Sequence, residues 1–165
     1  MKWHNHKLLT GLTIFLATSD PLATVSSMIG SIFPDSIEGK TFNPKIHRTH
    51  SHWFVYYVTI ATIISLYIMY TTKIMNIYNI NIYKTIMHYG IGIINNKIVI
   101  SLFILYFFIG CIFHILEDAV CGKIPLFNPN KKEFGIRLFV VGSIREYFFV
   151  ACCIFIMFFI KKMNL

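Results

Sequence analysis

The chain has 165 residues, of which 56% are hydrophobic and 13% charged, and its mean hydropathy of +0.63 excludes an ordinary soluble domain. The formal charge of +8 would suit a nucleic-acid partner, but the basic residues are spread between apolar runs and do not form one patch, which argues against such a partner. We therefore expect one membrane-embedded domain, residues 1–165, that is all-α.

The N-terminal third contains two short apolar segments, Leu8–Thr18 and Leu22–Phe33, separated by Ser19-Asp20-Pro21. Proline disfavours a helical conformation in the residue before it, so this tripeptide predicts a turn. Each segment would extend only ~18 Å as a helix, which is too short for a hydrocarbon core of ~30 Å. We predict a helical hairpin that dips into the membrane. A signal peptide is the alternative, because Lys2 and Lys7 precede an apolar stretch, although no small-x-small cleavage site follows.

Three later runs predict transmembrane helices. Trp53–Thr71 carries no charged residue, and Ile98–Leu116 carries none beyond one histidine. Both are close to the ~20 apolar residues that a spanning helix needs. Tyr147–Ile160 is shorter, but it can begin near Val140 and it ends on a pair of lysines. The expected fold is a helical membrane bundle with an N-terminal hairpin and about three transmembrane helices.

The loop charges predict an orientation. If the hairpin returns to its own side and each run crosses once, residues 1–52 and 117–146 share one side and contain ten Lys and Arg. The opposite side, residues 72–97 and 161–165, contains five. The positive-inside rule then places the first side in the cytoplasm.

This topology also gathers most of the polar residues on that cytoplasmic side. They are His6, Asp35, Glu38, His47, His50, His52, His114, Asp118 and Glu146. His114 and Asp118 are four apart and share a helix face, so they can bind one ion together. His47 and His50, three apart, can do the same if that segment is helical. Imidazole with carboxylate is typical of zinc, manganese or iron sites, whereas calcium prefers oxygen ligands alone.

Each residue also has a plainer interpretation. His114 alone is more often a polar residue satisfied within a helix bundle, and Asp35 after Pro34 is more often a turn residue. For His52, which precedes Trp53, we favour an interfacial position. Their convergence on one side favours a shared site, because ionisable residues at the edge of membrane helices are costly to desolvate.

Five motifs occur in the order found in the YdjM-like family of inner-membrane metal-dependent hydrolases, which the chain resembles. They are HKLLTGL (6–12), FPDSIEG (33–39), HRTHS (47–51), GCIFHILEDAVCGKIPLFNP (110–129) and GSIREYF (142–148). HRTHS is the most specific of them. The family often has a second Asp two residues after the first, where this chain has Ile37, and Glu38 is the candidate replacement.

The resemblance implies an all-helical protein of the bacterial inner membrane, likened to the zinc-dependent phospholipase C and nuclease class. The metal ligands that it implies are His6, Asp35, His50, His114 and Asp118, with His47 and Glu146 as further site members. Zinc is the expected metal, with manganese and iron as alternatives.

The ligand types suggest how the protein would hydrolyse an anionic phosphoester at the membrane surface. A phospholipid is the preferred substrate, ahead of a nucleic acid. Asp35 or Glu38 would orient or deprotonate water, and Arg48 would pair with a phosphate through its planar fork. Basic residues of the following loop would hold anionic headgroups nearby. These are Lys123, Lys131 and Lys132.

Two other classes remain open. In the first, the protein is not an enzyme, and a metal or polar cluster only joins short helices within a structural or assembly protein. Such a protein could form oligomers through Thr59, Thr62 and Ser65, small residues at every third position. A metal or proton transporter ranks third. It would need ionisable residues in the middle of its spans, and the predicted spans have none there.

Overall fold

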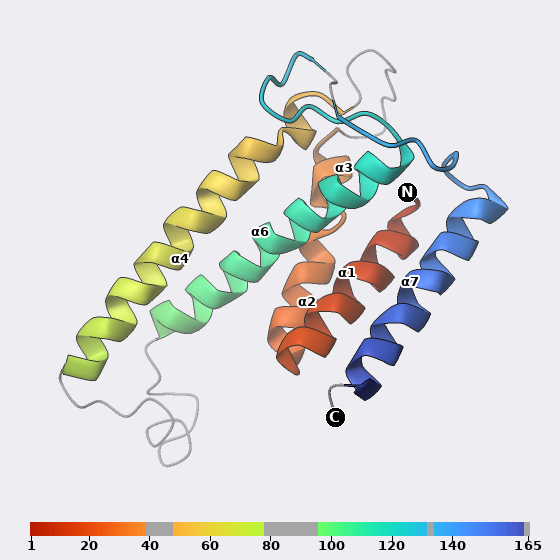
Figure 1. The fold of residues 1–165 in the computed structure, drawn as a ribbon. Coiled ribbons are helices and arrows are strands. Elements are labelled where there is room, and N and C mark those ends of the chain that lie inside the picture. The colour runs from red at the N-terminus through yellow and green to blue at the C-terminus, as the bar shows by residue number, and fades with distance from the viewer. Residues whose placement is uncertain (39–47, 78–95, 132–133, 164–165) are drawn as a thin grey trace.

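The structure, a computed structural model, describes residues 1–38, 48–77, 96–131 and 134–163 (Figure 1). The helices in these ranges are α1 (Trp3–Thr18), α2 (Pro21–Gly30), α3 (Phe33–Glu38), the 3₁₀ turn η1 (His50–His52), α4 (Phe54–Ile77), α6 (Asn96–Cys121) and α7 (Ile144–Met163). Among the described residues, extended pairing is limited to one isolated bridge, between Ile124 and Phe134. The expected all-α fold is confirmed.

The N-terminal hairpin forms where the sequence predicts it, as α1 and α2. Ser19 adopts a left-handed conformation (φ 54°) at the end of α1. Asp20 then caps α2, because its Oδ1 accepts hydrogen bonds from the N–H groups of Leu22 and Ala23, at 2.8 and 3.4 Å. Pro21 occupies the first helical position, where no N–H is needed.

Helices α2 and α6 contact each other through their backbones. A Cβ atom on Gly30 would lie 1.9 Å from the carbonyl oxygen of Phe107, and one on Gly110 would lie 2.1 Å from that of Ser27. No side chain fits at either place, so the two glycines permit the close approach. This contact sets the register of α6 against the hairpin.

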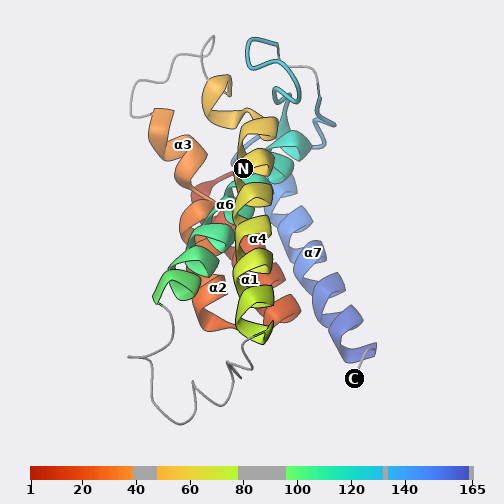
Figure 2. The ribbon, with the colours of Figure 1, turned by 90° about the vertical axis from the view of Figure 1, so that its left-hand side faces the viewer.

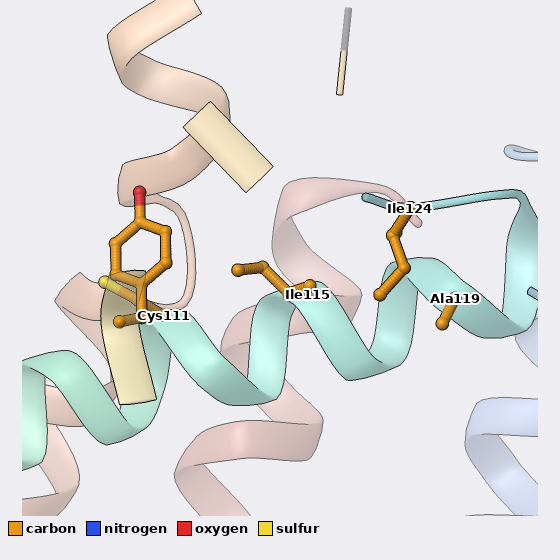
Figure 3. Packing of buried hydrophobic residues seen from close by; sticks show 5 residues of the cluster. Cys111, Ile115, Ala119 and Ile124 are labelled. Atoms are coloured by element: carbon orange, nitrogen blue, oxygen red, sulfur yellow. The ribbon is translucent and has the colours of Figure 1, made fainter. Parts of the chain in front are cut away.

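On another face, α6 packs against α4 through an apolar cluster. The buried members are Tyr57, Cys111, Ile115, Ala119 and Ile124. Figure 3 shows Cys111, Ile115 and Ala119 along one face of α6, at the four-residue spacing that brings helical side chains into line. The Tyr57 hydroxyl donates a hydrogen bond of 2.7 Å to the carbonyl oxygen of Ser51, which ties η1 to the start of α4.

Two helices are long and apolar enough to cross a membrane, over Phe54–Lys73 in α4 and Lys97–Cys121 in α6. A third crossing by α7 stays a prediction. In the small-residue stripe on α4, Thr59 and Thr62 are exposed and Ser65 is half-buried. A role for that stripe in oligomers also stays a prediction.

The two views agree on where the chain brings its helix ends together. The N-terminus, α3, the start of α4, the end of α6 and the start of α7 lie at one end of the bundle (Figures 1 and 2). The helix ends that carry most of the polar residues therefore meet there, as the predicted topology requires.

Candidate metal centre

Four side chains converge at this end, from α3, η1 and the last turns of α6. They are Asp35, His52, His114 and Asp118, here called the ligand group, and each offers one ligand atom within 4.8 Å of the others. The two histidines are fully buried and Asp118 is 1% exposed, whereas Asp35 is half-buried. No single element builds the site, which depends on how three segments meet.

The distances within the ligand group fit a single metal ion. His52 Nε2 lies 3.1 Å from His114 Nε2, 3.3 Å from Asp35 Oδ1 and 3.5 Å from Asp118 Oδ2. His114 Nε2 lies 3.5 Å from the same Asp35 oxygen and 3.8 Å from that of Asp118. Tetrahedral ligands at ~2.0–2.2 Å from a zinc ion are ~3.3–3.6 Å apart. The group therefore has close to the spacing of a tetrahedral shell.

His114 is oriented by the hairpin. Its Nδ1 lies 2.6 Å from the carbonyl oxygen of Ser31, and because a carbonyl only accepts, Nδ1 carries the proton. The Nε2 lone pair then points into the ligand group, which is the tautomer that a metal requires. Ser31 follows Gly30, and His114 lies one turn beyond Gly110, so the close glycine contact fixes this hydrogen bond.

His52 is oriented by Glu38. Its Nδ1 lies 3.2 Å from Glu38 Oε1 and 2.9 Å from Ser51 Oγ, so Nε2 faces the ligand group. Glu38 also accepts hydrogen bonds from the Arg48 N–H, at 2.8 Å, and from the Ser51 hydroxyl. These contacts make Glu38 a residue that positions the histidine.

The electrostatics of the ligand group also favour a cation. Burial opposes the imidazolium of His52, but Asp118, Asp35 and Glu38 outweigh burial and raise the pKa of His52 to about 10. Burial likewise opposes the charged form of Asp35, but the nearby His114 and His52 rings hold its pKa well below the usual range. Within the described part of the chain, Asp35 Oδ1 is buried and has no aligned hydrogen-bond donor, as expected of an oxygen that faces a metal ion.

His6, a predicted ligand, lies beside the ligand group. Its Nδ1 is 2.6 Å from Glu117 Oε2, and its Nε2 is 3.4 Å from Asp118 Oδ1. Its ring is stacked at a tilt on that of His114, with centroids 4.0 Å apart. Glu117 was not predicted as a site residue, although its position next to the predicted ligand Asp118 was a usable signal.

Two cationic groups approach Asp118. Arg48 Nε lies 2.8 Å from Asp118 Oδ2, although its N–H is not aligned for a hydrogen bond. The α-amino group of Met1 lies 2.5 Å from Asp118 Oδ1. The structure therefore places Arg48 beside Asp118, and its pairing with a phosphate stays a prediction.

Three other expectations have different outcomes. His52 is fully buried in the ligand group, so its interfacial interpretation is wrong. His50 is exposed and lies outside the group, and His47 lies outside the described residues. His50 and His52 are two residues apart in η1 and face different directions, so His52 is buried and His50 is exposed.

Glu146 is buried but lies outside the ligand group. It accepts hydrogen bonds from the Lys2 and Gly142 N–H groups, at 2.8 and 2.6 Å, and from the Asn5 amide at 2.5 Å. These contacts join the start of α7 to the start of α1, so the structure gives Glu146 an anchoring position.

Comparison with known proteins identifies one family. Its sequence profile, described as YdjM inner membrane protein, matches residues 1–164, essentially the whole chain. No curated protein and no solved structure matches the chain. The resemblance carried by the five motifs is thus confirmed, and the chain belongs to the YdjM inner membrane protein family.

Proposed function

We propose that the protein is a metal-dependent hydrolase that acts on a phosphoester at the membrane surface. The observation that carries the proposal is the ligand group, because two imidazoles and two carboxylates at this spacing suit zinc first, then manganese or iron. The proposal places this site on the cytoplasmic side of a multi-pass, single-domain protein, in accord with the ten basic residues on that side and five on the other.

The four ligands divide by exposure. His52, His114 and Asp118 are buried and would hold the ion, which is the two-imidazole, one-carboxylate set of many catalytic zinc sites. A metal ion held there would supply Lewis acidity, which lowers the pKa of a water molecule to ~7 and polarises a phosphoryl oxygen.

The most accessible member, Asp35, would act on the attacking water. The Trp3 indole N–H donates a 3.0 Å hydrogen bond to Asp35 Oδ2, which leaves Oδ1 facing the ligand group. Oδ1 would accept a hydrogen bond from the attacking water molecule and orient it, and the water proton would pass to solvent as the water oxygen bonds to phosphorus and the ester P–O bond breaks. The leaving alkoxide would take a proton from solvent, and Arg48 would pair with the phosphate.

The first experiment measures metal content in detergent-purified protein by elemental analysis. We expect near-stoichiometric zinc, manganese or iron, and its loss in His52→Ala and His114→Ala. His50→Ala is the matched control, because this exposed residue lies two positions from His52, and its metal content should be unchanged. A folded protein without metal after supplementation would refute the proposal. If metal is found, phosphoesterase assays of the metal-loaded protein follow.

A structural metal site is the second candidate, and one observation favours it. Four protein ligands at tetrahedral spacing would complete the shell of zinc and leave no open position. Asp35→Asn separates the two functions. A hydrolase should keep most of its metal and lose turnover in this variant, whereas a closed structural site should lose metal and stability together.

A further inference from the structure

An apolar groove, lined by residues of α1, α6 and α7, lies next to the ligand group. It has a volume of about 380 Å³, and its walls include Leu9 of α1, Phe113 and Val120 of α6, and Phe149 and Met157 of α7. Helix α7 packs against α1, and α1 in turn contacts α6. The volume lies within the ~300–1,000 Å³ typical of small-molecule sites.

The groove begins beside the ligand group and runs away from it. Val120 and Phe149 are near the end of the bundle that holds the ligand group, whereas Phe113 and Met157 are farther along their helices. Glu117 is the acidic residue in the wall, and it pairs with His6 next to Asp118. A molecule in the groove would therefore have an apolar part along the helices and one end close to the ligand group.

The surroundings of the groove indicate what fills it. One wall belongs to α6, which is apolar enough to span a membrane. At the rim, Leu116 and Ile156 are 43% and 54% exposed, and nearby Phe155 is 72% exposed. When α6 crosses a bilayer, these side chains face hydrocarbon. The groove therefore opens towards the acyl chains of the surrounding lipids.

The length of the groove suits one leaflet. Phe149 and Met157 are eight residues apart, which is ~12 Å along a helix. The hydrocarbon half of one leaflet is ~15 Å deep. We propose that the groove holds one acyl chain of a membrane phospholipid and thereby places its phosphate at the ligand group. That this lipid is also the substrate rests on the proposed function.

Photocrosslinking tests the occupant without requiring catalysis. The full-length protein is placed in nanodiscs that contain a phospholipid with a photoreactive acyl chain, and the crosslinked peptides are mapped. Cys153 lines the groove, so Cys153→Trp would fill it, whereas Ala151→Trp changes an exposed position two residues away. We expect crosslinks to residues 113–120 and 149–157 to fall roughly tenfold in the first variant and to be unchanged in the second.

Two results would overturn the inference. Equal crosslinking in both variants would show that the lipid contacts only the outer surface of the helices. Crosslinking between copies through Cys153, with a bifunctional maleimide, would show that a second chain covers the groove. Folding of each variant is checked by its elution as a single species in detergent.

A kinetic comparison separates this inference from the proposed function. Cys153→Trp should slow hydrolysis of a long-chain phospholipid roughly tenfold and leave a water-soluble phosphoester unaffected. Equal slowing of both substrates would contradict a role for the groove in substrate binding. Absence of turnover with either substrate would refute the hydrolase, while the crosslinks would still decide whether the groove holds a lipid chain.

Discussion

Gly110→Ala is expected to weaken metal binding, although residue 110 lies outside the ligand group. The new Cβ would lie 2.1 Å from the Ser27 carbonyl oxygen, and an ordinary contact needs at least 3.4 Å. Both atoms belong to helix backbones, so α2 and α6 must separate by about 1.3 Å. The 2.6 Å hydrogen bond from His114 Nδ1 to the Ser31 oxygen would stretch beyond hydrogen-bond range.

Loss of a partner that orients a metal-ligating histidine costs ~10–100-fold in metal affinity, which is the expected effect here. Affinity is measured by competition with a chromophoric chelator in detergent. Gly11→Ala is the matched control, because its Cβ would meet the flexible side chain of Met28, at 2.7 Å, and not a backbone. Wild-type affinity in a folded Gly110→Ala protein, or an equal loss in Gly11→Ala, would refute the proposed link between the helix contact and the ligand group.

Three further predictions concern the groups around the ligand group. Glu38→Gln should lower metal affinity by ~10–100-fold, because it weakens the carboxylate that orients His52, and unchanged affinity in the same chelator assay would contradict this role. Because the pKa of His52 is raised to about 10, metal binding at pH 7.5 should release about one proton, and affinity should fall ~tenfold per pH unit as the pH drops from 9 towards 7. Calorimetry in buffers of different ionisation enthalpy measures the number of protons released on metal binding. A metal affinity that does not change with pH would contradict this proton release. Glu146→Gln should destabilise the fold by about 1–3 kcal/mol, through three weakened hydrogen bonds, and keep its metal, so loss of metal without a lower thermal midpoint would contradict an anchoring role.

Local sequence signals predicted the fold well. Ser19-Asp20-Pro21 indicated a turn because proline and a capping aspartate act on their immediate neighbours, and the hairpin forms there. The uncharged runs predicted α4 and α6, because a membrane span needs an apolar stretch of defined length. The glycine contact between α2 and α6 was beyond such reasoning, since it depends on which two helices meet.

The site was predictable where helix periodicity determines it. His114 and Asp118 share a face because they are four residues apart, and both belong to the ligand group. His52 was not predictable, because the choice between it and His50 depends on the direction in which a 3₁₀ turn enters α4. That direction is fixed by contacts distant in sequence, such as Glu38 with His52 Nδ1.

The Gly-x-x-x-His-x-x-x-Asp pattern of α6 acquires a physical explanation from these contacts. Gly110, His114 and Asp118 recur every four residues and so lie along one helix face. The glycine allows α2 to touch α6, the histidine then reaches the Ser31 carbonyl one turn later, and the aspartate reaches His52 another turn later. The helix contact and the ligand positions are thus parts of one geometry, and a change in the spacing between the glycine and the histidine would disrupt the site even with every ligand retained.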